Sequence, residues 1–153
     1  AEYETPAVED SPFGGYRVFA DVMDATNRLH AAGVKTAIIS NADSDVTDLC
    51  VELEFAHGMD LIVTSALIGY EKPHIKTFEA AFEPLGVDPA LGLHIGDQPK
   101  SDVVGALNAG MRAALIDRYE RHDPAAHEVP IFIGLAELVD HVLAVNEQAA
   151  VPS

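Results

Sequence analysis

The sequence predicts an α/β protein in which a parallel sheet is flanked by helices. Short apolar runs alternate with longer segments whose apolar residues recur every three or four positions. Glycines follow several of the longer segments, as they commonly do at helix ends. Strands that alternate with helices imply parallel strands joined by right-handed crossovers. The 153 residues are enough for one domain with a substantial core.

The short apolar runs are predicted to form five strands. They lie at residues 35–39, 61–64, 93–96, 113–116 and 131–133. Helical spacing of apolar residues is found in the segments 18–29, 46–53, 75–85, 106–109 and 135–142. The ends of the chain, residues 1–15 and 148–153, are predicted to be a linker and a flexible tail.

The composition fits a globular domain and argues against some partners. Apolar residues make up 48% of the chain, and the formal net charge is −16 at pH 7. Nucleic acids and anionic membrane surfaces repel such a charge, so neither is an expected partner. No apolar run approaches the length of a membrane span, and no signal-peptide pattern is seen. The single cysteine, Cys50, allows no intramolecular disulfide, and a cytoplasmic location is the default expectation.

Two carboxylates follow the strand at 93–96. Asp97 lies in the turn after it, and Asp102 lies at the start of the next helix. Ligands of open α/β sheets bind beyond the carboxyl ends of the strands, so both carboxylates should face that crevice. Such a pair favours a hard cation, such as Mg²⁺, between itself and an anionic substrate. The alternative is structural, with Asp97 forming a turn and Asp102 favouring the helix dipole.

Ser40 and Asn41 follow the strand at 35–39 and should open into the same crevice. Their hydroxyl and amide groups can donate hydrogen bonds to phosphate oxygens without adding charge. Taken alone, the two residues are better explained as caps of the helix that starts near Ser44.

Lys72 stands before the helical segment at 75–85. It precedes Pro73, and proline suits the first position of a helix. A cation at the positive end of a helix is unfavourable unless it faces an anion or carboxylates. A solvated surface lysine is the general alternative. Ser-Asn after one strand, Lys-Pro before a helix and Gly-Asp after another strand together indicate one site.

The order of these motifs resembles that of the haloacid dehalogenase superfamily of hydrolases, over nearly all of residues 16–146. The matching segments are 37–41 for the family's second motif, 68–73 with Phe78 for the third, and 93–102 for the fourth. The chain looks closest to phosphatase-like members that carry a helical cap inserted upstream. The resemblance implies a Rossmann-like three-layer core over residues 16–147, with residues 1–15 as a linker or the remnant of a cap.

The resemblance also implies a role for each site residue. Ser40 would hold the transferring phosphoryl group with help from Asn41, and Lys72 would neutralise charge on the nucleophile and the phosphoryl group. Ser40 and Lys72 are thus the expected catalytic residues, and Asp97 and Asp102 would hold Mg²⁺. The implied activity is the Mg²⁺-dependent hydrolysis of a small phosphorylated metabolite through an aspartyl-phosphate.

The nucleophile of this reaction is the first aspartate of the family's Asp-x-Asp-x-Thr motif, which should lie before residue 16. Acids within the chain do not replace it. Asp21 and Asp24 have the wrong spacing, Asp43 and Asp45 follow the Ser-Asn motif, Asp60 precedes its strand, and Asp117 lacks a second acid two residues later. The chain by itself is therefore predicted to be inactive.

The strand that carries this motif is central in the family, so its absence predicts unpaired edges on the strands at 35–39 and 93–96. Three explanations stay open: a portion of a longer enzyme, pairing supplied by a second copy through dimerisation or strand exchange, or a degenerate relative. The functional alternatives are a non-catalytic binding or regulatory protein and a metal-free 2-haloacid dehalogenase. Gly96-Asp97 speaks against the dehalogenase, because halide displacement needs no cation there.

Overall fold

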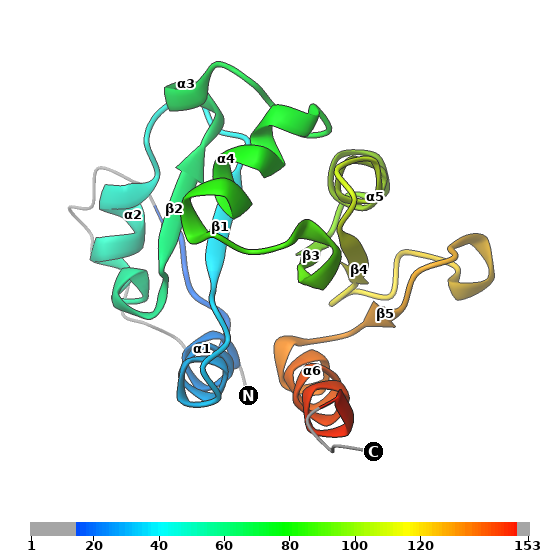
Figure 1. Cartoon of the computed structure of the whole chain (residues 1–153). Helices are drawn as coiled ribbons and strands as arrows, with labels where there is room; N and C mark the ends of the chain where they lie inside the picture. Colours follow the sequence, from blue (N-terminus) through cyan, green and yellow to red (C-terminus); the bar gives the residue numbers. More distant parts are fainter. Residues whose placement is uncertain (1–14, 150–153) are drawn as a thin grey trace.

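The computed structural model describes residues 15–149, which fold as alternating strands and helices (Figure 1). The strands are β1 (Ala37–Ser40), β2 (Leu61–Thr64), β3 (Leu93–Gly96), β4 (Arg112–Ile116) and β5 (Ile131–Phe132). The α-helices are α1 (Val22–Ala31), α2 (Thr47–Glu52), α3 (Ser65–Ile68), α4 (Ile75–Leu85), α5 (Gly105–Asn108) and α6 (Leu135–Ala149). Shorter helical segments are η1 (Ala56–Gly58), η2 (Pro89–Leu91), η4 (Pro124–Ala126) and the π-helix η3 (Pro99–Val104), which runs directly into α5.

The strands form two parallel sheets rather than one. β1 pairs with β2, which places Ser40 opposite Thr64, and β3, β4 and β5 form the second sheet in that order. Within residues 15–149 no strand joins β1 to β3, and the two sheets lie apart in Figure 1. As far as the described residues go, the predicted unpaired edges of β1 and β3 are therefore confirmed. Backbone groups along these edges need partners from outside the sheets.

Helices cover both faces of the sheets. α4 packs on β1, β2 and α5, and α1 packs against α6. One core cluster joins Phe78 of α4 to η3, α5 and β4, and Ile39 of β1 packs against it. A second cluster joins α1, β4, β5 and α6 around the buried Val139. The predicted three-layer α/β fold is confirmed, and apolar packing links two sheets that share no hydrogen-bond ladder.

The ends of α4 follow from local chemistry. His74 is the N-cap, and its ring nitrogen Nδ1 accepts the N–H of Lys76 at 3.2 Å. Pro73 is therefore not the first residue of the helix, and that expectation is wrong. Gly86 ends the helix at φ = +64°, a conformation that glycine adopts without steric cost.

Other boundaries shift by a few residues. α2 begins at Thr47 rather than near Ser44, because Oδ1 of Asp45 accepts the N–H of Thr47 at 2.9 Å. The short helix α3 has no counterpart in the predicted elements. α6 continues to Ala149, two residues beyond the predicted end of the core. The predicted linker, apart from Gly15, and residues 150–153 lie outside the described residues. No helix in the described part is long and apolar enough to cross a bilayer.

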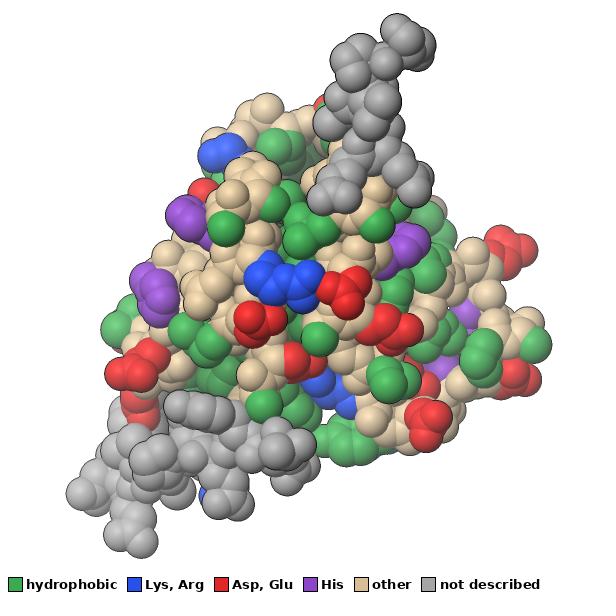
Figure 2. Space-filling model, turned by 90° about the horizontal axis from the view of Figure 1, so that it is seen from below, with side chains coloured by type: hydrophobic (Ala, Val, Ile, Leu, Met, Phe, Trp, Pro, Cys, Tyr) green, Lys and Arg blue, Asp and Glu red, His purple; other side chains and the backbone are tan. Residues whose placement is uncertain are grey.

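Acidic side chains are spread over much of the surface. Figure 2 shows them in several places on one face, with basic side chains set between them near its centre. This distribution agrees with the net charge of −16. A bound anion therefore needs local cations to reverse the field of the whole chain.

Candidate active site

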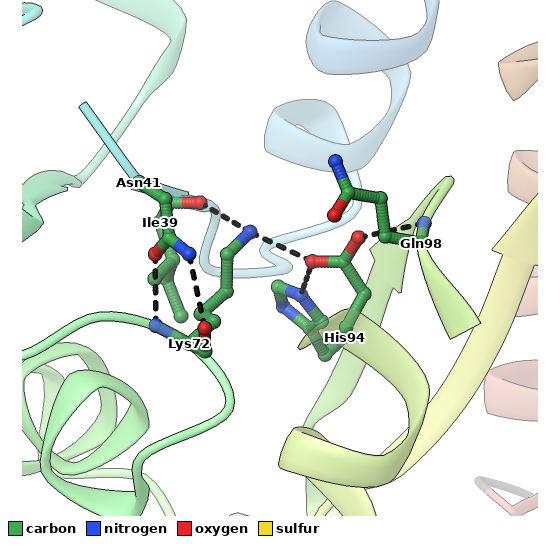
Figure 3. Close-up of polar contacts among 6 residues, drawn as sticks. Ile39, Asn41, Lys72, His94 and Gln98 are labelled. Atoms are coloured by element: carbon green, nitrogen blue, oxygen red, sulfur yellow. Dashed lines mark hydrogen bonds and ion pairs between the residues drawn. The ribbon is translucent and has the colours of Figure 1, made fainter. Parts of the chain in front are cut away.

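Three loops meet beyond the carboxyl ends of β1 and β3 (Figure 3). The first contains Ser40 and Asn41, at the end of β1. The second lies between α3 and α4 and contains Lys72. The third is the segment after β3, with Asp97 in the turn and Asp102 in the π-helix η3. The three motifs that the sequence placed at one site thus come from three loops that contact one another.

The Lys72 side chain bridges the two sheets. Its Nζ donates to the carbonyl oxygen of Ile39 in β1 at 2.9 Å and to Oδ1 of Asp102 at 2.7 Å (Figure 3). The side chains of Lys72 and Asp102 are 12% and 4% exposed, so the ion pair is shielded from water. Lys72 is therefore not a solvated surface lysine. Its ammonium satisfies a carbonyl on the open edge of β1, and its third N–H has no partner among the described residues.

Asn41 fixes the backbone of Lys72. Its Nδ2 donates to the Lys72 carbonyl oxygen at 3.0 Å, and its Oδ1 accepts the Lys72 N–H at 2.8 Å. Neither Asn41 nor Ser40 caps α2, whose N-cap is Val46, so the capping alternative is wrong. One N–H of the Asn41 amide remains for a ligand.

Asp102 is the buried centre of the site. Oδ1 lies 2.7 Å from Nζ of Lys72 and 3.0 Å from Nε2 of His94, and Oδ2 accepts the N–H of Gln98 at 3.0 Å. Burial by itself would raise the pKa of Asp102, but the hydrogen bonds from His94, Lys72 and Gln98 lower that pKa far below its ordinary value of 3.8. The ionised carboxylate only accepts hydrogen bonds, so Nε2 of His94 carries the proton in this contact.

Two glycines allow this close packing. A Cβ on Gly96 would lie 2.0 Å from Cγ of Asp102. A Cβ on Gly105 would lie 2.8 Å from the Phe78 ring and 2.9 Å from Cα of Pro73. The first glycine admits the Asp102 carboxylate beside β3, and the second lets α5 approach the loop that carries Lys72. The distance between Lys72 and Asp102 thus depends on two positions without side chains.

The loop after β1 is also held from β2. The hydroxyl of Ser65 accepts the N–H of Ala42 at 3.0 Å and lies 3.1 Å from the Ala42 carbonyl oxygen. The hydroxyl of Thr64 accepts the N–H of Val46 at 3.2 Å. Thr64 and Ser65 are 1% and 4% exposed, so these bonds are sheltered from water. They set where Ser40 and Asn41 lie.

Ser40 and Asp97 stand at the rim of this network. Ser40 is the last residue of β1, directly beyond the carbonyl of Ile39 that accepts from Lys72. Asp97 follows Gly96 directly after β3, is exposed, and lines a cavity beyond the ends of β3 and β4. Whether these two residues act in catalysis, substrate binding or metal binding stays a prediction.

His94 is a member of the site that sequence reasoning did not assign. It is 9% exposed, lies in β3, and packs edge-on to Phe78 with 5.1 Å between the ring centroids. The available signal was a polar residue between Leu93 and Ile95 in an otherwise apolar strand. A buried imidazole requires a hydrogen-bond partner, and the carboxylates downstream were the nearest candidates.

Three of the acids rejected as nucleophiles have hydrogen-bond partners in the fold. Both oxygens of Asp21 pair with the guanidinium of Arg118 at 2.9 Å, and Oδ2 also accepts the N–H of Leu135. Asp60 accepts the N–H of Thr36. The carboxylate of Asp117 accepts two backbone N–H groups from the loop that follows it. Asp21 and Asp60 thus join segments that are distant in sequence, and Asp117 holds the loop that follows it.

Asp43 and Asp45, together with Thr47, have the spacing of the family's first motif. Oδ1 of Asp45 accepts from both the N–H and the hydroxyl of Thr47, at 2.9 and 2.7 Å, and lies 3.4 Å from the hydroxyl of Thr64. These contacts form the entrance of α2. Asp45 therefore has a helix-start role, as its position after the Ser-Asn motif indicates.

Metal ligands are incomplete within the described residues, where no group of three or more His, Cys, Asp or Glu side chains is placed to hold an ion. Asp97 is exposed, and Oδ2 of Asp102 accepts a single N–H and keeps a lone pair. Two carboxylates are the right kind of ligand for Mg²⁺, which prefers oxygen, but they are too few for a tight site.

Comparison with known proteins decides the family. The family model described as "Haloacid dehalogenase-like hydrolase" matches residues 7–116, which is more than half of the chain. The chain belongs to the haloacid dehalogenase-like hydrolases. A glyceraldehyde 3-phosphate phosphatase from Methanothermobacter thermautotrophicus is 32% identical over 106 residues, which cover 69% of this chain and 47% of that protein. A phosphoserine phosphatase from Thermus thermophilus is 35% identical over 61% of this chain and 39% of that protein.

Solved structures of haloacid dehalogenase-like proteins share the fold. A HAD phosphatase from Thermococcus onnurineus superposes with a TM-score of 0.73 at 26% identity, over 82% of this chain and 58% of that one. A 2-haloacid dehalogenase from Pseudomonas syringae gives a TM-score of 0.72 at 28% identity, over 84% of this chain and 54% of that one. This haloacid dehalogenase-like chain thus spans less than two thirds of the length of these relatives.

Proposed function

We propose that this chain is the phosphate- and metal-binding part of a Mg²⁺-dependent phosphomonoester hydrolase, located in the cytoplasm, that acts on a small phosphorylated metabolite. The observation that carries the proposal is the Lys72 ammonium, held 2.7 Å from Asp102 beside the end of β1. Lys72 is paired with Asp102, but its third N–H has no partner among the described residues and can donate to an anionic ligand. The relatives named as phosphatases act, by name, on phosphate monoesters.

Each residue of the site would have a separate role in binding the phosphoryl group or the metal ion. The free N–H of Lys72 would donate to a phosphoryl oxygen, and Ser40 and Asn41 would donate from the end of β1. Asp102 would hold the lysine in place, with His94 fixing the carboxylate from the opposite side. Asp97 and Oδ2 of Asp102 would hold Mg²⁺, which supplies positive charge against the phosphoryl group when it is bound.

The nucleophile is expected on a strand between β1 and β3. Each of these strands has one paired edge in the described part, and their other edges face the space between the two sheets. A strand inserted there would end beside Lys72 and Asp97, where the attacking aspartate of an aspartyl-phosphate mechanism belongs. A longer polypeptide or a second copy of the chain would supply it.

Phosphate binding tests the proposal without requiring turnover. Inorganic phosphate is titrated into the ¹⁵N-labelled chain with Mg²⁺ present, and the amide shifts at the ends of β1 and β3 are followed. Lys72→Met should weaken phosphate binding by at least about 10-fold, because one charge-assisted hydrogen bond contributes about that factor to the affinity. Lys35→Met is the matched control, because Lys35 is exposed and pairs only loosely, at 4.0 Å, with Asp60.

A second variant covers the risk that Lys72→Met unfolds the chain. Ser40→Ala removes one hydroxyl and none of the hydrogen bonds that hold Lys72, and it should weaken phosphate binding by about 3- to 10-fold. Shifts that are equal in wild type and both variants would contradict the proposal. The same titration with 2-chloropropionate tests the dehalogenase alternative, which predicts binding that needs no Mg²⁺.

A further inference from the structure

A cavity of about 270 Å³ lies next to the candidate site, beyond the ends of β3 and β4. Gly96 and Asp97 form the side that faces the site, and residues 116–119, 121 and 122 form the other side together with Phe19. Gly96 also packs directly on the Asp102 carboxylate. A phosphate ester whose phosphoryl group lay at Lys72 and Asp97 would therefore have this cavity available for the rest of the molecule.

The two arginines that line the cavity differ in their pairing. Arg118 makes two hydrogen bonds of 2.9 Å to Asp21, and its guanidinium lies 4.0 Å from the centre of the Phe19 ring. Its charge is thus already balanced. The Arg121 guanidinium lies 4.8 Å from the centre of the exposed Tyr119 ring, and no carboxylate of the described residues pairs with it. Arg121 is the cation in this cavity whose charge is available to a ligand.

The loop that presents Arg121 is anchored rather than free. The Asp117 carboxylate, 6% exposed at the end of β4, accepts the N–H of Arg121 at 2.9 Å and the N–H of His122 at 2.7 Å. These bonds use the backbone N–H groups of both residues, and both residues line the cavity. A fixed loop that holds an unpaired arginine beside a substrate crevice is suited to recognising an anionic group.

We infer that this cavity binds a second anionic group of the substrate, a carboxylate carried one or two carbons from the phosphate ester, and that Arg121 is the residue that recognises it. The inference rests on the proposed function, because it assumes that the phosphoryl group occupies the neighbouring site. It narrows the substrate from any phosphate monoester to an acidic one. The field of a chain with charge −16 opposes this preference, so a local cation is required to produce it.

Two probes that differ in one group test the inference. 2-Phosphoglycolate and ethyl phosphate share the phosphate ester and its length, but only the first carries a carboxylate. Each is titrated into the ¹⁵N-labelled chain with Mg²⁺, beside inorganic phosphate. Wild type should bind 2-phosphoglycolate about 10-fold more tightly than ethyl phosphate, because one arginine–carboxylate contact contributes about that factor to the affinity.

Arg121→Gln should reduce this preference to about 2-fold or less and leave the affinity for inorganic phosphate unchanged. Arg112→Gln is the matched control, since Arg112 is exposed at the opposite end of β4, and the preference should persist in it. The inference would be overturned if wild type bound the two probes equally, or if the preference for 2-phosphoglycolate persisted in Arg121→Gln. In either case, binding of inorganic phosphate would still support the proposed function. If inorganic phosphate also fails to bind, the proposed function is wrong and this inference falls with it.

Discussion

Nζ of Lys72 and Oδ1 of Asp102 lie 2.7 Å apart, although Lys72 lies in the loop between α3 and α4 and Asp102 lies in η3, after a strand of the other sheet. The same Nζ reaches the Ile39 carbonyl on the open edge of β1. One ammonium therefore links β1 to the segment after β3, where no strand of the described residues does so. The residue expected to neutralise substrate charge also joins the two halves of the site.

Removal of the Lys72 cation should destabilise the fold. Lys72→Met leaves Asp102 buried with His94 and Gln98 as its remaining partners, and the free energy of unfolding should fall by about 2–4 kcal/mol. Urea denaturation followed by circular dichroism measures this loss. Lys35→Met, which breaks only an exposed pair, should cost less than about 1 kcal/mol. Equal losses in the two variants would mean that the buried pair contributes nothing specific.

The ion pair between Lys72 and Asp102 makes the stability of the fold depend on pH. The pKa of Asp102 is lowered in the folded chain, despite the opposing effect of burial, by hydrogen bonds from His94, Lys72 and Gln98. A carboxylate whose pKa is lower in the folded than in the unfolded state stabilises the fold above its unfolded pKa of 3.8, and this stability is lost as pH falls below that value.

Unfolding free energies measured from pH 6 down to pH 2 should therefore fall more steeply in wild type than in Asp102→Asn, because the amide has no proton to gain. Asp102→Asn should be less stable than wild type at pH 6, and the difference should narrow below about pH 4. Parallel curves for the two proteins would show that the Asp102 pKa is not lowered by folding.

A methyl group added at Gly105 should disrupt the close packing there and destabilise the fold. Its added Cβ would lie 2.8 Å from the Phe78 ring and 2.9 Å from backbone Cα of Pro73, so the loop with Lys72 must move. Gly105→Ala should cost about 1–3 kcal/mol in unfolding free energy and weaken phosphate binding together with it. Gly58→Ala is the control, since its Cβ would meet only the Thr26 side chain at 3.4 Å. A Gly105→Ala variant as stable as Gly58→Ala would contradict the role given to this contact.

The chain alone should not hydrolyse an aryl phosphate such as p-nitrophenyl phosphate at an enzymatic rate, because the described residues contain no strand between β1 and β3 to carry the expected nucleophile. Steady-state assays with Mg²⁺ check this directly. The informative variants are Asp43→Asn and Asp45→Asn, since these residues have the spacing of the family's nucleophile motif. Turnover that either variant abolishes would show that the nucleophile lies after β1 and that the helix-start role of Asp45 is incomplete.

Mg²⁺ should bind weakly to the chain alone. Two carboxylates leave most of an octahedral shell to water, so calorimetry at physiological ionic strength should give a dissociation constant in the range of about 1 mM or weaker. Asp97→Asn should reduce binding more than Asp43→Asn does, because only Asp97 adjoins Asp102. A tight stoichiometric site would require a third carboxylate from outside the described residues, for example from a second copy of the chain. No difference between Asp97→Asn and wild type would favour a turn-forming role for Asp97.

The sequence by itself determined the order of the strands and of the longer helices, and it grouped Asn41, Lys72 and Asp102. The four-residue run at 61–64 and the helical spacing from Ile75 to Leu85 fix β2 and α4 at their observed bounds, because local periodicity decides these elements. Gly86 ends α4 because glycine adopts a positive φ without steric cost. The grouping of Asn41, Lys72 and Asp102 was readable because parallel strands place their following loops at one edge of a sheet.

Only the tertiary structure decided how these groups share their hydrogen bonds. His94 contacts Asp102 because the turn after β3 folds back on the strand past Gly96, a contact that no periodicity records. The charge of Arg118 is balanced because Asp21, 97 residues away in sequence, lies against it. The charge of Arg121 is available because no carboxylate of the described residues pairs with it. Spacing indicates which residues face a crevice. Contacts between segments that are distant in sequence decide which hydrogen-bond donors at the crevice are already paired. Those contacts form only when the chain is folded.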